Sequence, residues 1–163
     1  MIIVNKNGTL IHNKKLYKCS LGKKGITKNK KEGDKKTPSG IFSLGKVFYR
    51  KDRIQNLKTK LNKTFIKKNM AWCDDPLKKT YNKLIFTKDK SKEKLYRKDH
   101  LYDIIIVIKY NMRPIKKNKG SAIFIHLAKR NYSGTLGCIG LKKKDLLEIL
   151  QSLSKTTKIK IVS

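Results

Sequence analysis

Short apolar runs separated by polar turns dominate the first twenty residues and predict strands. Residues 2–4, 9–11 and 16–20 each carry apolar or β-branched side chains. Asn7-Gly8 separates the first two runs and favours a tight hairpin, because both positions tolerate positive φ. Asn13-Lys14 is the expected turn before the third run. The chain is therefore predicted to open as an antiparallel meander.

Four later runs also have the character of strands. Residues 41–48 follow a segment dense in turn-forming residues. Residues 104–108 are apolar on both faces, as expected of a central strand. Residues 121–126 form a second predicted core strand that ends at His126, and residues 158–162 alternate at period two.

Helical spacing appears at two places. After Cys138, one predicted helix face carries Leu146, Leu147, Leu150 and Leu153. Within residues 50–69 the apolar positions also recur near every 3.6 residues, at Ile54, Leu57, Leu61 and Phe65, which predicts a surface helix. Lysine-rich segments at residues 23–36 and 88–94 are predicted loops. No internal repeat or long linker divides the chain, so the pattern predicts a single domain over residues 1–163, mostly β with α.

The charge of the chain suggests an anionic partner, but its distribution weakens that interpretation. There are 42 Lys and Arg residues against 11 Asp and Glu, a formal net charge of +31. Lysine is spread along the whole chain, whereas proteins that read DNA sequence usually rely on arginine for bidentate base contacts. No specific nucleic acid is expected. A nucleic-acid-associated protein stays an alternative, because charge alone carries nonspecific affinity.

Localisation and thiol chemistry are constrained by what the sequence lacks. No apolar run approaches the ~20 residues of a membrane span, and the apolar part of the N-terminus is too short for a secretory signal. The three cysteines form no CxxC pair, so a zinc or thioredoxin-type site is not indicated. Cys19 and Cys73 are predicted to be buried small hydrophobic residues, and their spacing does not establish a disulfide.

Cys138 has the surroundings of a candidate nucleophile. A thiol reacts as its thiolate, which a nearby imidazole can generate and a helix N-terminus can stabilise. His126 ends a predicted core strand, and Cys138 lies shortly before the predicted helix. Gly137 leaves room for a carbonyl beside the sulfur, with backbone amides available to a tetrahedral oxyanion. From spacing alone, however, His126 can equally be a buried strand-end residue and Gly137 a turn residue.

A wider set of segments resembles the L,D-transpeptidase (YkuD-type) catalytic domain. His126 followed by Thr135-Leu-Gly-Cys-Ile139 is similar to that family's signature. Further segments resemble it in the same order, namely residues 33–42, 70–76, 93–103, 110–111 and 120–126. Together they span about residues 33 to 150. Many family members carry histidine and arginine where this chain has Leu136 and Gly140, which leaves the substrate choice open.

The resemblance implies a mixed β-sandwich with one helix following the loop of the catalytic cysteine. It further implies that Cys138 and His126 are the catalytic residues of an acyltransferase that acts on peptidoglycan stem peptides through a thioester. Gly137, Thr135 and Arg97 are the expected oxyanion or substrate-binding residues. Arg97 could pair with a substrate carboxylate, or equally with Asp99 or Asp103. No metal and no cofactor are expected.

Several points stay open at this level. The alternatives are an L,D-carboxypeptidase of the same fold or a catalytically silent module. The resemblance implies the periplasm or cell envelope, but no signal peptide is visible, so a cytoplasmic location stays open, as does the oligomeric state. His12 is expected to be exposed or structural, and His100 to be a surface or structural residue. Packing roles are expected for Trp72, Tyr102 and Tyr110.

Overall fold

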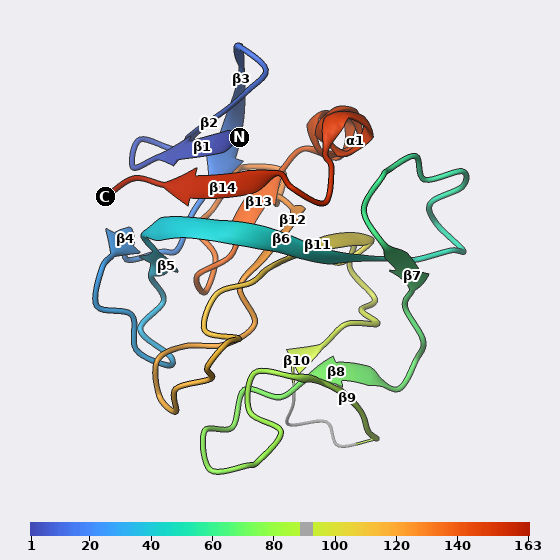
Figure 1. Ribbon diagram of the computed structural model, residues 1–163. Coiled ribbons are helices and arrows are strands. Elements are labelled where there is room, and N and C mark those ends of the chain that lie inside the picture. The colour runs from blue at the N-terminus through green and yellow to red at the C-terminus, as the bar shows by residue number, and fades with distance from the viewer. Residues whose placement is uncertain (89–92) are drawn as a thin grey trace.

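The computed structural model describes residues 1–88 and 93–163 (Figure 1). Within these residues the chain forms fourteen strands and one helix. The strands are β1 (Ile2–Asn5), β2 (Thr9–His12), β3 (Lys15–Ser20), β4 (Ile26–Thr27), β5 (Thr37–Pro38), β6 (Gly40–Tyr49), β7 (Lys63–Phe65), β8 (Met70–Trp72), β9 (Leu84–Phe86), β10 (Glu93–Lys94), β11 (Ile104–Ile108), β12 (Phe124–Leu127), β13 (Ile139–Leu141) and β14 (Lys158–Ile161). The helix is α1 (Lys143–Ser152). Of the charged loop predicted at residues 88–94, residues 89–92 lie outside the described part.

The main sheet has nine strands and closes on itself. Its order is β11-β12-β13-β3-β2-β1-β14-β6-β7, and a further pairing joins β11 to β6. The sheet is mixed, because β12 runs parallel to β13 and β1 parallel to β14, whereas β1, β2 and β3 form the predicted antiparallel meander. The prediction of a mostly β protein with one helix is confirmed. The two faces of the expected sandwich belong to one sheet that curves round.

Strand β11 separates two apolar clusters. Ile104, Ile106 and Ile108 pack inside the main sheet, where the larger cluster also contains the buried side chains of α1. Ile105 and Val107 point the other way, toward a small sheet of order β10-β8-β9. Figure 1 shows α1 and this small sheet on opposite sides of β6 and β11. The prediction that residues 104–108 form a central strand is therefore confirmed.

Helix α1 begins only after β13 and buries one face. Leu146, Ile149 and Leu150 are its buried residues, which agrees with the predicted helical period. The hydroxyl oxygen of Ser152, the last residue of the helix, lies 2.8 Å from Nε2 of His12. His12 is itself buried, so its role is structural and its side chain is not exposed.

The helix predicted within residues 50–69 is wrong. This segment is a succession of turns that ends in β7, which pairs in parallel with β6. Ile54, Leu57 and Leu61 are buried in the main cluster, so their spacing reflects three separate contacts with the core. Asn56 has φ +50°, a conformation that interrupts a right-handed helix. Tertiary packing has overridden a weak local pattern.

Candidate active site

Two neighbouring parallel strands bring His126 and Cys138 to the same face of the sheet. His126 lies in β12, and Cys138 directly precedes β13. Ile125 pairs with Ile139, so Cys138 lies one position earlier, beside Phe124. Because alternate residues of a strand share a face, Phe124 and His126 point in the same direction. Both predicted residues, together with Arg97, Thr135 and Leu136, line one cleft of about 560 Å³.

The thiol of Cys138 is buried and hydrogen-bonded to the start of β12. Its Sγ donates to the carbonyl oxygen of Ala122 at 3.2 Å and accepts from the amide of Phe124 at 3.4 Å. Only 6% of Cys138 is exposed. Burial raises the pKa of the Cys138 thiol to about 12, against an opposing effect of the Phe124 amide. At neutral pH the resting side chain is therefore a protonated thiol.

The imidazole of His126 is held in one orientation by the backbone. Nδ1 lies 2.8 Å from the carbonyl oxygen of Leu127, a contact in which Nδ1 carries the proton and donates it. The ring also meets that of Tyr102 edge-on, with 5.2 Å between their centroids. Burial lowers the pKa of His126 to about 4. The ring is consequently neutral near pH 7, and Nε2 carries a lone pair that can accept a proton.

The helix does not stabilise the thiol in the way the sequence suggested. Strand β13 lies between Cys138 and the first residue of α1, and three extended residues span about 10 Å. The influence of a helix dipole falls off within its first turn. The partners of Sγ come instead from Ala122 and Phe124. The proposed contribution of the helix N-terminus is thus corrected.

Thr135 and Gly137 shape the loop that carries the thiol. The hydroxyl of Thr135 donates to the Cys138 carbonyl oxygen at 2.6 Å and accepts from the Gly137 amide at 3.1 Å. Gly137 has φ +138°, and a Cβ there would lie 2.8 Å from the carbonyl oxygen of Lys36. Glycine is required because this backbone conformation and the close approach of Lys36 both exclude a side chain. The Gly137 amide is already engaged by Thr135.

The loop of Lys36 is fixed in turn by Asp34, which belongs to the segment at residues 33–42. The carboxylate of Asp34 accepts hydrogen bonds from the amides of Lys31 and Lys36, at 2.8 and 2.9 Å. It also pairs with the buried ammonium group of Lys30 at 2.5 Å. These contacts lower the pKa of Asp34 although burial alone would raise it. Asp34 therefore stabilises the loop that contacts Gly137.

Arg97 reaches the cleft but already has carboxylate partners. Its Nη2 lies 2.6 Å from Oδ2 of Asp99, and its Nη1 lies 3.8 Å from Oε1 of Glu93. The guanidinium also lies over the ring of Tyr102, 5.0 Å from its centroid. Of the two internal partners considered from the sequence, Asp99 is the one observed. A substrate carboxylate at Arg97 would have to share the guanidinium with it.

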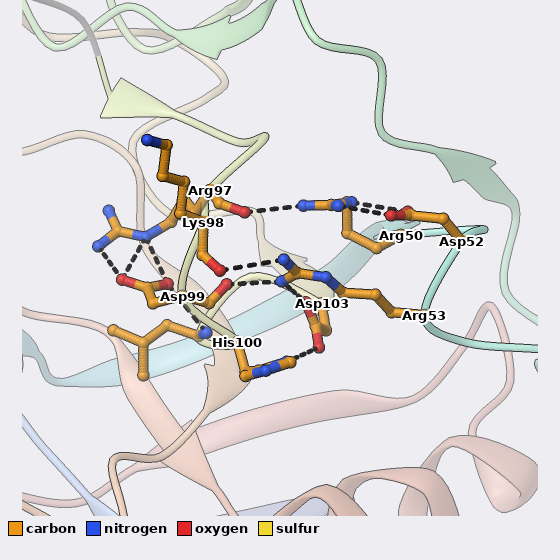
Figure 2. A network of polar contacts seen from close by, with 9 residues as sticks. Arg50, Asp52, Arg53, Arg97, Lys98, Asp99, His100 and Asp103 are labelled. Carbon is orange, nitrogen blue, oxygen red and sulfur yellow. Dashed lines mark hydrogen bonds and ion pairs between the residues drawn. The ribbon is translucent and has the colours of Figure 1, made fainter.

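A network of arginines holds the backbone on which Arg97 lies (Figure 2). Arg53 donates to the carbonyl oxygens of Lys98 and Asp99 and to the carboxylate of Asp103. Arg50 donates to the carbonyl oxygen of Arg97 at 2.7 Å. His100 pairs with Asp103 at 2.7 Å, while its own side chain is 78% exposed. His100 is accordingly a surface residue with a structural contact.

Sequence reasoning missed the acidic residues of the cleft. The chain has 11 acidic residues, and among those that the structure describes Glu32, Asp74, Glu93 and Asp99 line the cleft. Burial is the largest influence on Glu93 and raises the pKa of its carboxyl group. The available signal was the rarity of acidic residues in a lysine-rich chain. Their position in the folded chain could not be inferred from that rarity.

The remaining candidates are structural, as expected. Cys19, Cys73 and Cys138 are all free thiols, so no disulfide joins the first two. Trp72 is buried and meets Phe124 edge-on, with 5.1 Å between ring centroids.

The described part of the chain contains no helix long and apolar enough to cross a membrane.

Gly140 occupies a position with no room for a side chain. A Cβ on Gly140 would lie 2.3 Å from Oγ of Ser20 and 3.1 Å from Cα of Ala128. We expect Gly140→Ala to lower the stability by about 1–3 kcal/mol through overpacking, measured as a lower Tm by calorimetry. Adding Ser20→Ala should recover part of the loss, because it removes the nearest atom. An unchanged Tm for Gly140→Ala alone would contradict this account.

A family model and a solved structure are similar to this chain. A family model described as the L,D-transpeptidase catalytic domain, YkuD, matches residues 1–161. A comparison with curated proteins finds no match. The crystal structure of the helical cell shape determining protein Pgp2 from Campylobacter jejuni is similar with a TM-score of 0.47 and 16% identity. The alignment covers 98% of this chain and 46% of that one, so the present chain spans less than half of Pgp2. By the family match, the chain belongs to the YkuD family of L,D-transpeptidase catalytic domains.

Proposed function

We propose that this chain is a cysteine-dependent L,D-transpeptidase of peptidoglycan stem peptides, with Cys138 as the nucleophile and His126 as the base. The observation that carries the proposal is the orientation of His126 in the cleft it shares with Cys138. Nδ1 of His126 donates a hydrogen bond to the Leu127 carbonyl oxygen, so the nitrogen that can act as a base is Nε2. No side-chain carboxylate is needed to fix this tautomer.

The first half-reaction forms a thioester. As Sγ of Cys138 attacks the carbonyl carbon after the third residue of a tetrapeptide stem, the thiol proton passes to Nε2 of His126. The tetrahedral intermediate collapses by breaking the bond to the terminal D-Ala, whose amine leaves with the proton from the imidazolium. Both groups are neutral at rest, because their pKa values of about 12 and about 4 lie on either side of neutrality. The ion pair is therefore formed during the reaction and is not stored beforehand.

The second half-reaction decides the type of product. An amine of a diamino acid on a second stem attacks the thioester, gives its proton to His126 and displaces the Cys138 thiolate, which is then reprotonated. The product is a 3→3 cross-link between two stems. With water as the acceptor the same steps release a shortened stem, and the enzyme is a carboxypeptidase. The expected site of action is the cell envelope, where the substrate lies.

Mass spectrometry of purified muropeptides incubated with the protein tests this function. We expect cross-linked dimers, each formed with loss of one D-Ala from the donor stem. Shortened stems without dimers would assign the carboxypeptidase activity instead. The absence of both products from a folded protein with a reduced thiol would favour a silent module. Binding to nucleic acid that survives physiological salt would favour the nucleic-acid-associated alternative.

A further inference from the structure

We propose that Asn82 is a positioning residue for the nucleophile, which it reaches through the backbone of Ala122. The inference rests on the proposed role of Cys138 as nucleophile. The chain of contacts runs from the side chain of Asn82 to the Ala122 amide, and from the Ala122 carbonyl oxygen to Sγ of Cys138.

Asn82 is buried with both ends of its amide engaged. Its Oδ1 accepts from Nε1 of Trp72 at 2.9 Å and from the amide of Ala122 at 3.1 Å. Its Nδ2 donates to the carbonyl oxygens of Tyr110 and Asn111, at 3.1 and 2.8 Å. Such a fully bonded amide is fixed in orientation, because rotating it would leave buried groups unpaired. Asn82 is thus a rigid link between the small sheet and the loop before β12.

Ala122 holds a backbone conformation that alanine rarely adopts. Its φ is +51°, in the left-handed region that favours glycine and asparagine. Such a conformation persists only where surrounding contacts impose it. The bond from the Ala122 amide to Asn82 is one such contact. Two residues earlier, the Gly120 amide donates to the hydroxyl of Tyr81 at 3.1 Å. Tyr81 and Asn82, which are neighbours in the sequence, therefore both accept hydrogen bonds from the loop at residues 120–122.

These hydrogen bonds fix the direction of the Ala122 carbonyl group. Its oxygen accepts the proton of the Cys138 thiol, which fixes where Sγ points. A hydrogen bond to the neutral thiol also disfavours the thiolate. The other groups that influence this thiol electrostatically are Glu93 of β10, Tyr102 and Lys30, and His126 lines the same cleft from β12. None of the hydrogen bonds described for the Asn82 side chain involves these groups.

The decisive variant is Asn82→Gly, because glycine accepts the φ of +55° at this position and removes only the side chain. Released from Asn82, Ala122 should relax and withdraw its carbonyl oxygen from Sγ. We expect a lower apparent pKa of Cys138, read from the pH dependence of iodoacetamide alkylation. Turnover on muropeptides should fall by roughly tenfold or more in kcat with little change in KM, since orientation is lost.

Two further variants separate positioning from general loosening. In an Ala122→Gly background the left-handed conformation costs nothing sterically, so adding Asn82→Gly should have a smaller effect on both readouts. Trp72→Phe is the matched control, since it removes the other donor to Oδ1 of Asn82 and should leave the alkylation profile as in the wild type. Should Asn82→Gly fail to fold, Ala122→Val supplies the second route. Its β-branched side chain opposes φ +51° and should lower the same pKa.

A folded Asn82→Gly protein with the alkylation profile and kcat of the wild type would overturn the proposal. So would an equal loss in the presence and absence of Ala122→Gly. Alkylation needs no acyl transfer, so the two proposals fail separately. A shifted alkylation profile in a protein whose wild type is inert toward muropeptides would reject the transpeptidase activity and retain the positioning of the thiol by Asn82.

Discussion

Cys138→Ala is expected to abolish turnover and to remove the site of acylation by carbapenems. These drugs present a strained amide carbonyl next to a carboxylate, which a thiol can open without expelling a leaving group. Intact-protein mass spectrometry of the wild type should show one added drug mass, and peptide mapping should place it on Cys138. The variant should stay unmodified. Its Tm should change little, because only one sulfur atom is removed.

The other two cysteines supply the controls for this experiment. Cys19 and Cys73 are buried free thiols, and burial raises the pKa of Cys19 to about 12 as well. Burial and a high pKa therefore do not distinguish a nucleophile in this chain. The distinguishing feature is the cleft that Cys138 shares with His126. Cys19→Ala and Cys73→Ala should retain acylation, and loss of the adduct in either folded variant would show that the nucleophile is misassigned.

His126→Ala should reduce turnover by about 100-fold or more, the usual scale of general acid–base catalysis. In the proposed mechanism, Nε2 both accepts the thiol proton and returns it to the leaving amine. Since burial lowers the pKa of His126 to about 4, wild-type kcat/KM should decline only as the pH falls toward 4. This acid limb should be absent in the variant. Steady-state kinetics between pH 4 and 8 measure both effects.

His100→Ala is the matched control for the loss of an imidazole. His100 is largely exposed and bonds to Asp103, outside the lining of the cleft. Its removal should leave both turnover and the acid limb close to those of the wild type. If instead His126→Ala retained most of the wild-type turnover, another group would have to accept the proton of the thiol.

Local sequence patterns predicted the elements that depend on tight turns and those whose side chains form a buried apolar run or face. The hairpins around Gly8 and Asn13, the five apolar residues of β11 and the buried face of α1 all follow from periodicity and turn chemistry. Strand β13 was missed because three apolar residues between a loop and a helix have no period of their own. The false helix at residues 50–69 arose because contacts with a core imitate helical spacing.

Of the candidate site, only the proposed nucleophile and base could be predicted from the sequence. Cys138 and His126 are rare residue types in a recognisable pattern, whereas the groups that orient them are backbone atoms. The positions of the Ala122 and Leu127 carbonyl oxygens depend on backbone conformation and strand register, which cannot be read from residue types. Asn82 lies 56 positions before Cys138 and reaches it only through tertiary structure. A periodic pattern carries no information on such a contact.

The resting protonation of the thiol has a consequence for how the protein withstands oxidants. Peroxides and disulfides react with thiolates far faster than with thiols, so oxidation follows the fraction of thiolate present. With the pKa of Cys138 raised to about 12, that fraction is very small. In the proposed mechanism it rises only when a substrate is attacked and the proton passes to His126. Damage by oxidants would therefore be confined largely to the moments of catalysis. A permanently ionised cysteine would be exposed to sulfenic acid formation throughout the life of the molecule.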